Sequence, residues 1–273
     1  VFLARFPDID IGKRAALAIG ALSLGNSNSQ VRSVSAYVFR PLFKMLAFPD
    51  EELRHCAALA VITSILGDHP NDKDTLTREG GGIEPLVALA RSKNANCAHC
   101  GVYAIGSVMD RQDSVDEAFS LGDDLLDIIV KTVDSGDLNT KRAAGYVLAI
   151  LATDISRHEI LRMTGGIRCA TKLASQADSE CQEYGAFAIA HMSRNSLVQA
   201  ELVKEWKVVP ILVSIMATRS DARSYAATSL LSLAENNENH LEMAEHGVIQ
   251  SLLSLRGDEK PPPRRKFLNT ETV

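Results

Sequence analysis

Apolar and polar positions alternate along this chain with helical spacing, and the same order of segments returns several times. In Gly165–Asn195, a Gly-Gly turn precedes a short apolar segment, a polar loop and a longer segment rich in small residues. Apolar residues three and four positions apart predict helices that bury one face. The sequence therefore predicts an all-α protein built from a repeated helical unit.

Two independent columns of residues give the period of the repeat. A small residue recurs inside the long helix at Ala15, Ala57, Gly101, Ala143, Gly185 and Ala226, in steps of 42, 44, 42, 42 and 41 residues. An apolar residue recurs at the start of the shorter helix at Phe39, Ile83, Leu125, Ile167, Val209 and Ile249, in steps of 44, 42, 42, 42 and 40 residues. A period of roughly 40–47 residues is typical of armadillo and HEAT repeats.

Glycine and proline positions refine the repeated unit. Gly in a helix interior costs about 1 kcal/mol relative to Ala, so Gly101, Gly145 and Gly185 are expected at close contacts between stacked helices. The prolines that follow the apolar column, in the predicted first turn of the shorter helix, are Pro41, Pro85 and Pro210. The glycines expected to turn the chain before that helix are Gly81-Gly82, Gly165-Gly166 and Gly247. Ser156–Met163 and Glu238–Glu245 predict a further short helix, so each unit has three helices, which favours armadillo over HEAT.

The segment Gly81–Val108, GGIEPLVALARSKNANCAHCGVYAIGSV, resembles the armadillo-repeat consensus. Gly165–Met192 and Val208–Leu233 resemble it too, and the resemblance covers roughly Gly12 to Leu255. It implies a right-handed superhelical solenoid with about five full repeats and partial repeats at the ends. We expect residues 1–258 to form the solenoid and 259–273 to be a flexible, basic, Pro-rich tail. Without an initiator Met, and starting in a third helix, the sequence is expected to begin inside an array or to have been trimmed.

The resemblance also implies where a partner binds. In armadillo proteins the long third helices line a concave groove, and positions four residues apart on one helix share a face. The first such position holds Lys13, His55, His99, Lys141, Glu183 and Ser224. The second holds Leu17, Leu59, Tyr103, Gly145, Phe187 and Thr228. The third holds Ala21, Thr63, Ser107, Ala149, His191 and Ser232.

From these positions and their neighbours we predict a partner-binding groove. Its candidate residues are Lys13, His55, His99, Tyr103, Ser107, Arg111, Lys141, Phe187, His191 and Arg194. Basic residues predominate in the first half, whereas Glu183 and Glu235 lie in the second. Aromatic and Arg side chains are enriched at protein interfaces, so the pattern favours a protein or peptide partner with an acidic or amphipathic segment.

Composition excludes several other classes of protein. The net charge is −5 and aromatic residues make up 5% of the chain, whereas a nucleic-acid binder usually has a basic excess or stripe. No apolar run approaches the roughly 18 residues of a membrane span, and no secretory signal is visible. We expect a cytoplasmic protein. Adaptors made almost only of armadillo repeats are often lipid-anchored through an N-terminus outside the repeats, which allows a peripheral position on the cytosolic face of a membrane.

No catalytic, metal or cofactor motif emerges from the sequence. Cys97 and Cys100 form a CxxC, but a zinc site needs about four ligands and no second pair is near in the sequence, so we interpret these thiols as structural. The run Gly80–Gly82 lacks the Lys-Ser/Thr of a phosphate-binding loop. The seven histidines are dispersed. We therefore predict a scaffold or adaptor that is not an enzyme and uses no cofactor.

Two alternatives remain at this point. One is a regulatory armadillo domain of a larger enzyme, which the missing start of the chain permits. The other is an importin-like cargo receptor. Importin-type receptors carry Trp at the second groove position and Asn at the third, and both are missing here; the nearest substitutes are Tyr103 with Ser107 and Phe187 with His191.

Overall fold

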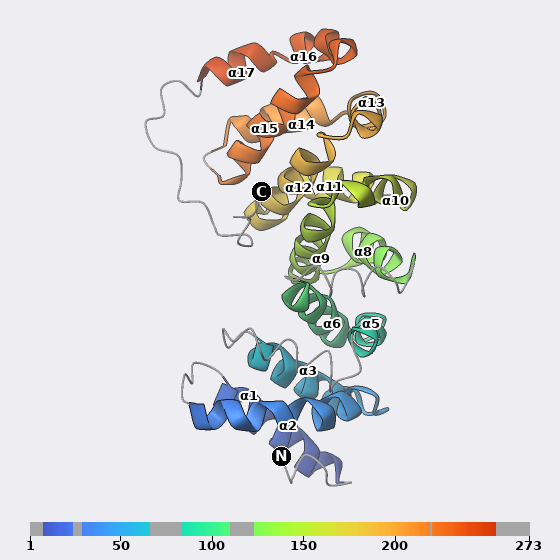
Figure 1. Ribbon diagram of the computed structural model, residues 1–273, viewed down its shortest axis with the longest axis vertical. Helices are drawn as coiled ribbons and strands as arrows, with labels where there is room; N and C mark the ends of the chain where they lie inside the picture. The colour runs from blue at the N-terminus through green and yellow to red at the C-terminus, as the bar shows by residue number, and fades with distance from the viewer. Residues whose placement is uncertain (1–7, 24–28, 66–82, 110–122, 219, 255–273) are drawn as a thin grey trace. The chain divides into compact units, whose positions relative to one another are not determined.

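The computed structural model describes residues 8–23, 29–65, 83–109, 123–218 and 220–254, and every regular element in these ranges is a helix (Figure 1). This confirms the all-α prediction. The chain divides into two compact units, Val1–Ile128 and Ile129–Val273, with the boundary inside α8 (Asp123–Ser135). Each unit is described by itself. The predicted tail, 259–273, lies outside the described residues.

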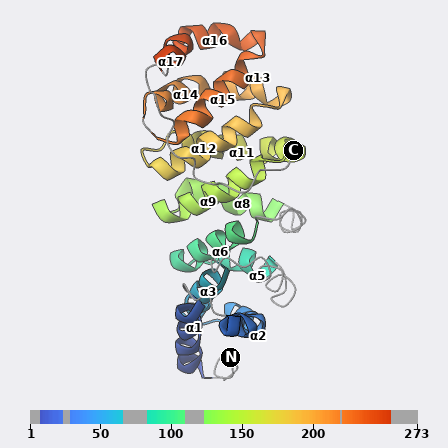
Figure 2. The ribbon, with the colours of Figure 1, turned by 60° about the vertical axis from the view of Figure 1, so that its left-hand side comes forward.

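Unit 1 is a stack of long helices with shorter ones beside them. Its other described helices are α1 (Ile9–Ser23), α2 (Ser29–Leu46), α3 (Glu51–Ile65), α5 (Glu84–Ala90) and α6 (Ala95–Val108). Helix α3 packs against both α1 and α6, while α2 packs on α3 and α5 on α6 (Figure 2). The predicted third helices of successive repeats are thus α1, α3 and α6, side by side.

One element of unit 1 differs from the prediction. Pro85 lies in the first turn of α5, and Pro210 lies in the first turn of its counterpart in unit 2, as expected. Pro41, however, lies inside α2, which runs without a break from Ser29 to Leu46. This helix combines the first and second helices of its repeat. The backbone shows why: α2 has no residue in the left-handed conformation that Gly165, Lys207 and Gly247 adopt between the first and second helices in unit 2.

Unit 2 contains two complete three-helix repeats between partial ones. Its first third helix, after the end of α8, is α9 (Leu138–Ala152). One repeat follows as η2 (Ile155–Arg157) with α10 (His158–Met163), α11 (Gly166–Ala174) and α12 (Ser179–Met192). The next is α13 (Ser196–Lys204), α14 (Val208–Met216) and α15 (Ala222–Ala234), and the last two elements are η3 (Asn237–Asn239) with α16 (His240–Glu245), and α17 (Val248–Ser254). Helix α12 packs against α9, α11 and α15.

A left-handed residue separates the first and second helices in each repeat of unit 2. Gly165 has φ +88° and Gly247 has φ +67°, a conformation that glycine adopts without steric cost. Lys207 occupies the same place in the middle repeat with φ +49°. The predicted role of Gly165 and Gly247 is confirmed, whereas Gly81 and Gly82 lie outside the described residues.

At Gly101 and Gly185 the small-residue column marks where the third helix touches the second helix of its own repeat. A Cβ at Gly185 would lie 2.7 Å from the carbonyl oxygen of Ala170 and 2.8 Å from the Cα of Ala174, both on α11. A Cβ at Gly101 would lie 2.7 Å from the Cα of Ala90 on α5. The backbones approach so closely that any side chain would collide with main-chain atoms. The predicted close contact is confirmed, and its partner is the second helix.

Third helices other than α15 also begin with a shared side-chain cap, whereas Asp221 before α15 makes no capping hydrogen bond. Side-chain oxygens of Asp50, Asp137 and Asp178 accept hydrogen bonds from the backbone N–H three residues later, at 2.7, 3.1 and 3.0 Å. Asp8 and Asn94 cap α1 and α6 in the same way. Such caps satisfy N–H groups that have no partner within the helix. These residues recur in steps of 41–44, a column that the sequence analysis did not include.

Side chains from the first helices in unit 2 form hydrogen bonds with carbonyl oxygens at the C-terminal ends of the preceding third helices. His158 Nε2 lies 2.8 Å from the carbonyl oxygen of Ala152, and Asn239 Nδ2 donates to Leu233 at 2.9 Å. Gln199 Nε2 donates to the carbonyl oxygens of Ser193 and Ser232, at 2.8 and 3.0 Å. The last carbonyls of a helix lack partners within it, so these buried side chains join one repeat to the next.

Candidate functional site

The middle third helix of unit 2 leaves one stripe of side chains only partly covered. Along α12 and its end, Glu180, Tyr184, Phe187, His191 and Arg194 are half-buried or exposed. Their spacing of four, three, four and three residues places them on one face of the helix. The stripe spans about 21 Å at a rise of about 1.5 Å per residue. Because α9 and α15 pack on either side of α12, the stripe lies in the middle of a three-helix surface.

Aromatic rings from all three helices meet on this surface. The ring centroids of Tyr146 on α9 and Tyr184 on α12 are 5.8 Å apart. Phe187 lies edge-on to Tyr225 of α15 at 5.0 Å and beside His191 at 4.5 Å. These separations fall in the range of favourable ring pairs, which contribute about 0.5–1.5 kcal/mol each beyond area burial. All five rings are only half-buried, so they offer apolar surface to a partner.

The structure brings together some predicted residues of unit 2 and adds others. Lys141, Phe187 and His191 are half-buried and Arg194 is exposed, all on α9 or α12 or directly after α12. The sequence analysis missed Tyr146, Tyr184 and Tyr225, each of which follows a predicted groove position by one residue. A usable signal existed: four of the five tyrosines lie in predicted third helices, namely Tyr103, Tyr146, Tyr184 and Tyr225.

Three predicted groove positions in unit 2 are wrong because they are buried. The exposed fractions of Glu183 and Ala149 are 5% and 2%, and Gly145 is buried as well. At Gly145 a Cβ would lie 3.1 Å from the Cβ of Tyr184, so α12 covers this part of α9. The accessible stripe is therefore rotated from the one that the regular four-residue spacing predicted.

His191 is kept neutral at physiological pH. Burial lowers the pKa of its imidazole to about 4, and electrostatic interactions with Arg194 and His158 act in the same direction. A neutral ring beside Phe187 leaves the centre of the surface uncharged.

A charge cluster holds the N-terminal ends of α9 and α12 together. The Arg142 guanidinium donates to both carboxylate oxygens of Asp178, at 3.0 and 2.5 Å, and lies 3.4 Å from Glu180. Its hydrogen bonds hold the pKa of the Asp178 carboxyl well below its usual range. Arg142 and Glu180 stand one helical turn before Tyr146 and Tyr184, so this cluster also positions that pair of rings.

Unit 1 presents a different third-helix surface. Leu17 on α1 and Leu59 on α3 are 50% and 37% exposed at the second groove position. Tyr103 occupies the same position on α6, half-buried, with its ring 6.1 Å from that of His99. Ser107 donates its hydroxyl to the Tyr103 carbonyl at 2.9 Å. These side chains form a mainly apolar row across three adjacent helices.

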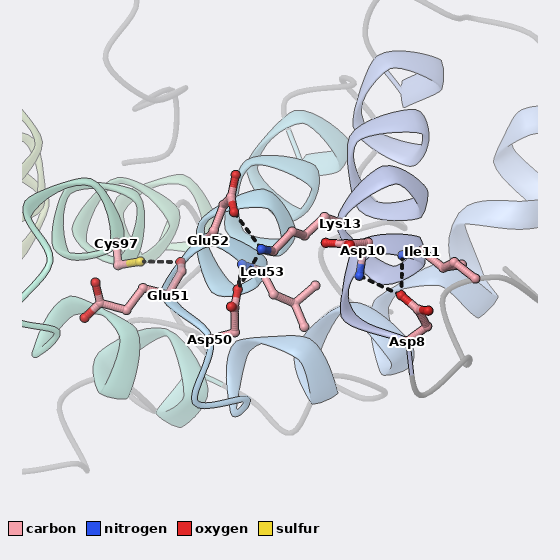
Figure 3. Close-up of polar contacts among 9 residues, drawn as sticks. All are labelled: Asp8, Asp10, Ile11, Lys13, Asp50, Glu51, Glu52, Leu53 and Cys97. Atoms are coloured by element: carbon pink, nitrogen blue, oxygen red, sulfur yellow. Dashed lines mark hydrogen bonds and ion pairs between the residues drawn. The ribbon is translucent and has the colours of Figure 1, made fainter.

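The positive charge predicted for unit 1 is largely balanced by acids. Figure 3 shows Lys13 reaching from α1 to the N-terminal end of α3, where its Nζ lies 2.6 Å from Glu52 and 3.2 Å from Asp50. Asp8, Asp10 and Glu51 lie at the same ends of α1 and α3. The expectation of a basic first half therefore fails at Lys13. His55 and His99 are half-buried, and Arg111 lies outside the described residues.

The cysteines have structural positions. All five thiols are free and buried, and burial raises the pKa of Cys100 to about 11. Cys97 contacts the carbonyl oxygen of Glu51 at 3.5 Å. The described residues contain no cluster of three or more His, Cys, Asp or Glu suited to a metal ion. No described helix has the length and apolar character needed to cross a membrane.

Comparison with known proteins supports the fold. No protein-family model matches the chain. A crystal structure of computationally designed armadillo repeat proteins for modular peptide recognition is 21% identical with a TM-score of 0.75, and the match covers 84% of this chain and 96% of that one. A designed armadillo repeat protein in complex with the peptide (KR)4 is also 21% identical with a TM-score of 0.73, over 85% of this chain and 96% of that one.

A further engineered protein is 22% identical with a TM-score of 0.83, and the match covers 94% of this chain and 63% of that one. These similarities agree with the two complete three-helix repeats of unit 2 and with the stacked third helices of each unit. The chain therefore has the armadillo-repeat fold.

Proposed function

We propose that the protein is a non-catalytic scaffold or adaptor that binds a segment of a partner protein on the third helices of unit 2. The aromatic face, as we name this surface, consists of Lys141, Tyr146, Tyr184, Phe187, His191, Arg194 and Tyr225. Extended surfaces made by stacked repeats are the usual binding sites of solenoid proteins. Two of the similar structures are designed for peptide recognition or carry a bound peptide, which supports a peptide-type partner.

The half-exposed ring of Phe187 is the observation that carries the proposal. Phe187 contacts Tyr225 of α15 and His191 of its own helix, and its side chain is still only half-buried. Large aromatic side chains fixed by their neighbours lose little conformational entropy on binding and are enriched among binding hot spots. We therefore place the anchoring contact of the partner at Phe187.

The charges around the rings suit an amphipathic segment with acidic residues. Arg142 is already bound by Asp178 and Glu180 and needs no partner charge. Lys141 and Arg194 lie toward opposite ends of the aromatic face, half-buried and exposed respectively. Apolar side chains of the partner would cover the rings, while its carboxylates would meet these two cations. Such charge pairs affect association rate and specificity more than affinity.

The remaining groove candidates form part of the same proposal. Four of these candidates lie on third helices of unit 1 and stay predictions: His55, His99, Tyr103 and Ser107. The role of Arg111 stays a prediction.

Five free cysteine thiols favour a reducing, cytosolic environment.

A binding assay with defined peptides tests the proposal. A fluorescein-labelled amphipathic peptide of leucine and glutamate is titrated with the full chain, and binding is followed by fluorescence anisotropy. Phe187→Ala is expected to weaken binding by about thirtyfold, the equivalent of a hot spot of about 2 kcal/mol. Arg194→Glu is expected to reduce affinity less and to slow association.

Two exposed residues on other helices supply matched controls. Leu197→Ala removes a 73% exposed apolar side chain on α13, and Lys131→Glu reverses a charge on α8. Both variants should bind like the unchanged protein. Equal binding by a folded Phe187→Ala variant and the Leu197→Ala control would show that the aromatic face is not the binding site.

A further inference from the structure

The last second helix of unit 2, α17, leaves two apolar positions uncovered. The apolar column reaches it at Ile249, which is 63% exposed, and Leu252 is 39% exposed. The other members of this column are no more than 2% exposed: Phe39, Ile83, Leu125, Ile167 and Val209. Ala170, at the place of Leu252 on α11, lies against the third helix at Gly185. The open face of α17 is therefore the one that a third helix covers on α11.

The last described third helix, α15, also has an uncovered apolar position. A Cβ at Gly20 on α1 would lie 3.3 Å from the Cα of Ala60 on α3, so this position faces the third helix that follows. Leu231 holds the same position on α15 and is 69% exposed. The other members of this column are buried: Gly20, Ile62, Gly106, Leu148 and Ala190. Among the described residues, α15 and α17 thus lack the third helix that the same positions contact elsewhere.

Helix α1 in unit 1 has the complementary open positions. On α3, Ala60 and Ser64 face the preceding third helix, because Ala60 packs on α1 as just described and Ser64 Oγ lies 3.0 Å from Ser23 Oγ. Their counterparts on α1 are Ala18, which is exposed, and Leu22, which is 60% exposed. The later members of the Leu22 column are no more than 5% exposed: Ser64, Val108, Ile150, Met192 and Leu233. Helix α1 therefore leaves open the face that other third helices pack on the third helix before them.

The sequence after α17 does not continue the third-helix pattern. Steps of 41 or 42 residues from Ala226 lead to positions 267 and 268, which hold Phe267 and Leu268 in place of a small residue. Close packing of a third helix on a second helix uses Gly at Gly101 and Gly185, where the backbones nearly touch. The segment that follows α17 therefore lacks the small residue by which a third helix packs on the second helix of its repeat.

We propose that copies of this chain associate end to end, with α1 of one copy packing on α15 and α17 of another as the third helix of its last repeat. Exposed apolar residues gathered on one surface mark interaction sites. The large Leu231 would meet the small Ala18 of the second copy, and Leu22 and Ile249 would be covered in the same contact. The same pair of positions on α9 and α12 holds residues that are both fully buried: Leu148 and Ala188.

Such a contact joins two different surfaces, so it is heterologous and leaves one open face on each outer copy. Further copies can therefore add to a pair. The inference goes beyond the proposed function, because it concerns α1, α15 and α17 and a second copy of the chain, whereas the proposed function concerns a different partner on the aromatic face.

Sedimentation velocity of the full chain tests the inference. From about 1 to about 100 µM, the average mass of the unchanged protein should rise from the 29.6 kDa of one copy to more than twice that value, as mass action requires. Leu22→Glu and Ile249→Glu should each sediment as single copies, because each removes one half of the contact. Leu253→Glu, at a second 60% exposed position on α17, should do the same. Leu197→Glu on α13 is the matched control and should associate like the unchanged protein, and circular dichroism melting curves verify that every variant is folded.

A mixture of two variants gives the sharpest result. Leu22→Glu keeps an intact α17 face and Ile249→Glu keeps an intact α1 face, so the mixture should form pairs and nothing larger. Phe187→Ala should leave association unchanged, and Leu22→Glu should bind the leucine–glutamate peptide like the unchanged protein, which separates this inference from the proposed function. The inference would be overturned by unchanged protein that stays a single copy at the highest concentration, by either single variant associating like unchanged protein, or by a mixture that forms no pairs.

Discussion

Each unit stacks its own third helices in the same way, but the side chains on the open faces of the two stacks differ. In unit 1, Leu17, Leu59 and Tyr103 form a row in register, mostly aliphatic, on α1, α3 and α6. In unit 2, the surface is made of rings from Tyr146, Tyr184, Phe187 and Tyr225, which stand at positions out of register with one another. The backbone contacts that hold the repeats are common to both units, as Gly101 and Gly185 show. Side chains on the open face are free of that constraint and can diverge.

The charged contacts of the two units differ in the same way. Lys13 in unit 1 and Arg142 in unit 2 both reach the N-terminal end of the next third helix. Lys13 makes a point contact with each of two carboxylates, Asp50 and Glu52. Arg142 instead grips one carboxylate, Asp178, with two parallel hydrogen bonds. Bidentate pairs of this kind are stronger and more directional, so unit 2 depends more on its cation for positioning.

The largest expected effect tests the feature that the units share. Gly185→Ala and Gly101→Ala should each destabilise the protein by about 1–3 kcal/mol, because the added Cβ collides with main-chain atoms that cannot move aside. Gly12→Ala is the matched control, since its nearest neighbour is the side-chain atom Leu53 Cδ1 at 3.2 Å. Its free energy of unfolding should stay within about 1 kcal/mol of the unchanged protein. Chemical denaturation followed by circular dichroism measures the free energy of unfolding of all three variants. A Gly185→Ala variant as stable as the unchanged protein would contradict a close backbone contact shared by the two units.

An intermediate effect sharpens the contrast between Arg142 and Lys13. The pKa of Asp178 is lowered in the folded protein, chiefly by hydrogen bonds from Arg142. Stability from this group is therefore present above its unfolded pKa of about 3.9 and is lost as the pH falls toward the folded value. Arg142→Met should lower the melting temperature at pH 7 and reduce the further loss between pH 5 and pH 3.

Lys13→Met should behave differently in the same measurement. The pKa of Asp50 is lowered first by the backbone N–H of Leu53, and Lys13 contributes less. The acid sensitivity from Asp50 should therefore survive the substitution. Melting curves recorded from pH 7 to pH 3 compare the two variants. If the melting temperature depended on pH identically in both, Arg142 would matter no more to its carboxylate than Lys13 does.

The smallest expected effect concerns the third groove position in both units. Ser107→Ala and Ser232→Ala should change the free energy of unfolding by no more than about 0.5 kcal/mol, because both side chains are half-buried and alanine is a better helix former. Denaturation midpoints check this. A loss above 1 kcal/mol in either variant would mean that its hydroxyl helps to hold the stack together.

Most of the helical framework followed from the sequence because it depends on local and periodic signals. The third helices, the turns at Gly165 and Gly247, and the close contacts at Gly101 and Gly185 were all predicted. The caps at Asp50 and Asp178 were equally visible as a column and were missed. Helix α2 was predicted as two helices because its repeat was assumed to keep a turn, although its sequence contains no glycine there.

The sequence did not predict equally well which side chains of the stacked third helices are accessible to a partner. The regular spacing placed Gly145 and Ala149 on the open surface, but both are buried because α12 leans over that part of α9. Tyr184 is half-buried beside Gly145 and pairs with the ring of Tyr146, a contact that no single column indicates. Lys13 was assigned as a groove cation, and its pairing with Glu52 depends on a residue 39 positions away.

What the sequence by itself determined is the repeated helical unit, since the period of small and apolar residues expresses contacts that every repeat makes with its own helices. Tertiary structure alone decided which side chains remain accessible and which charges are already neutralised. Those properties depend on the angle and distance at which one third helix meets the next. Because side chains such as Tyr184 and Lys13 reach across that contact, their exposure and partners are set between repeats and not within them.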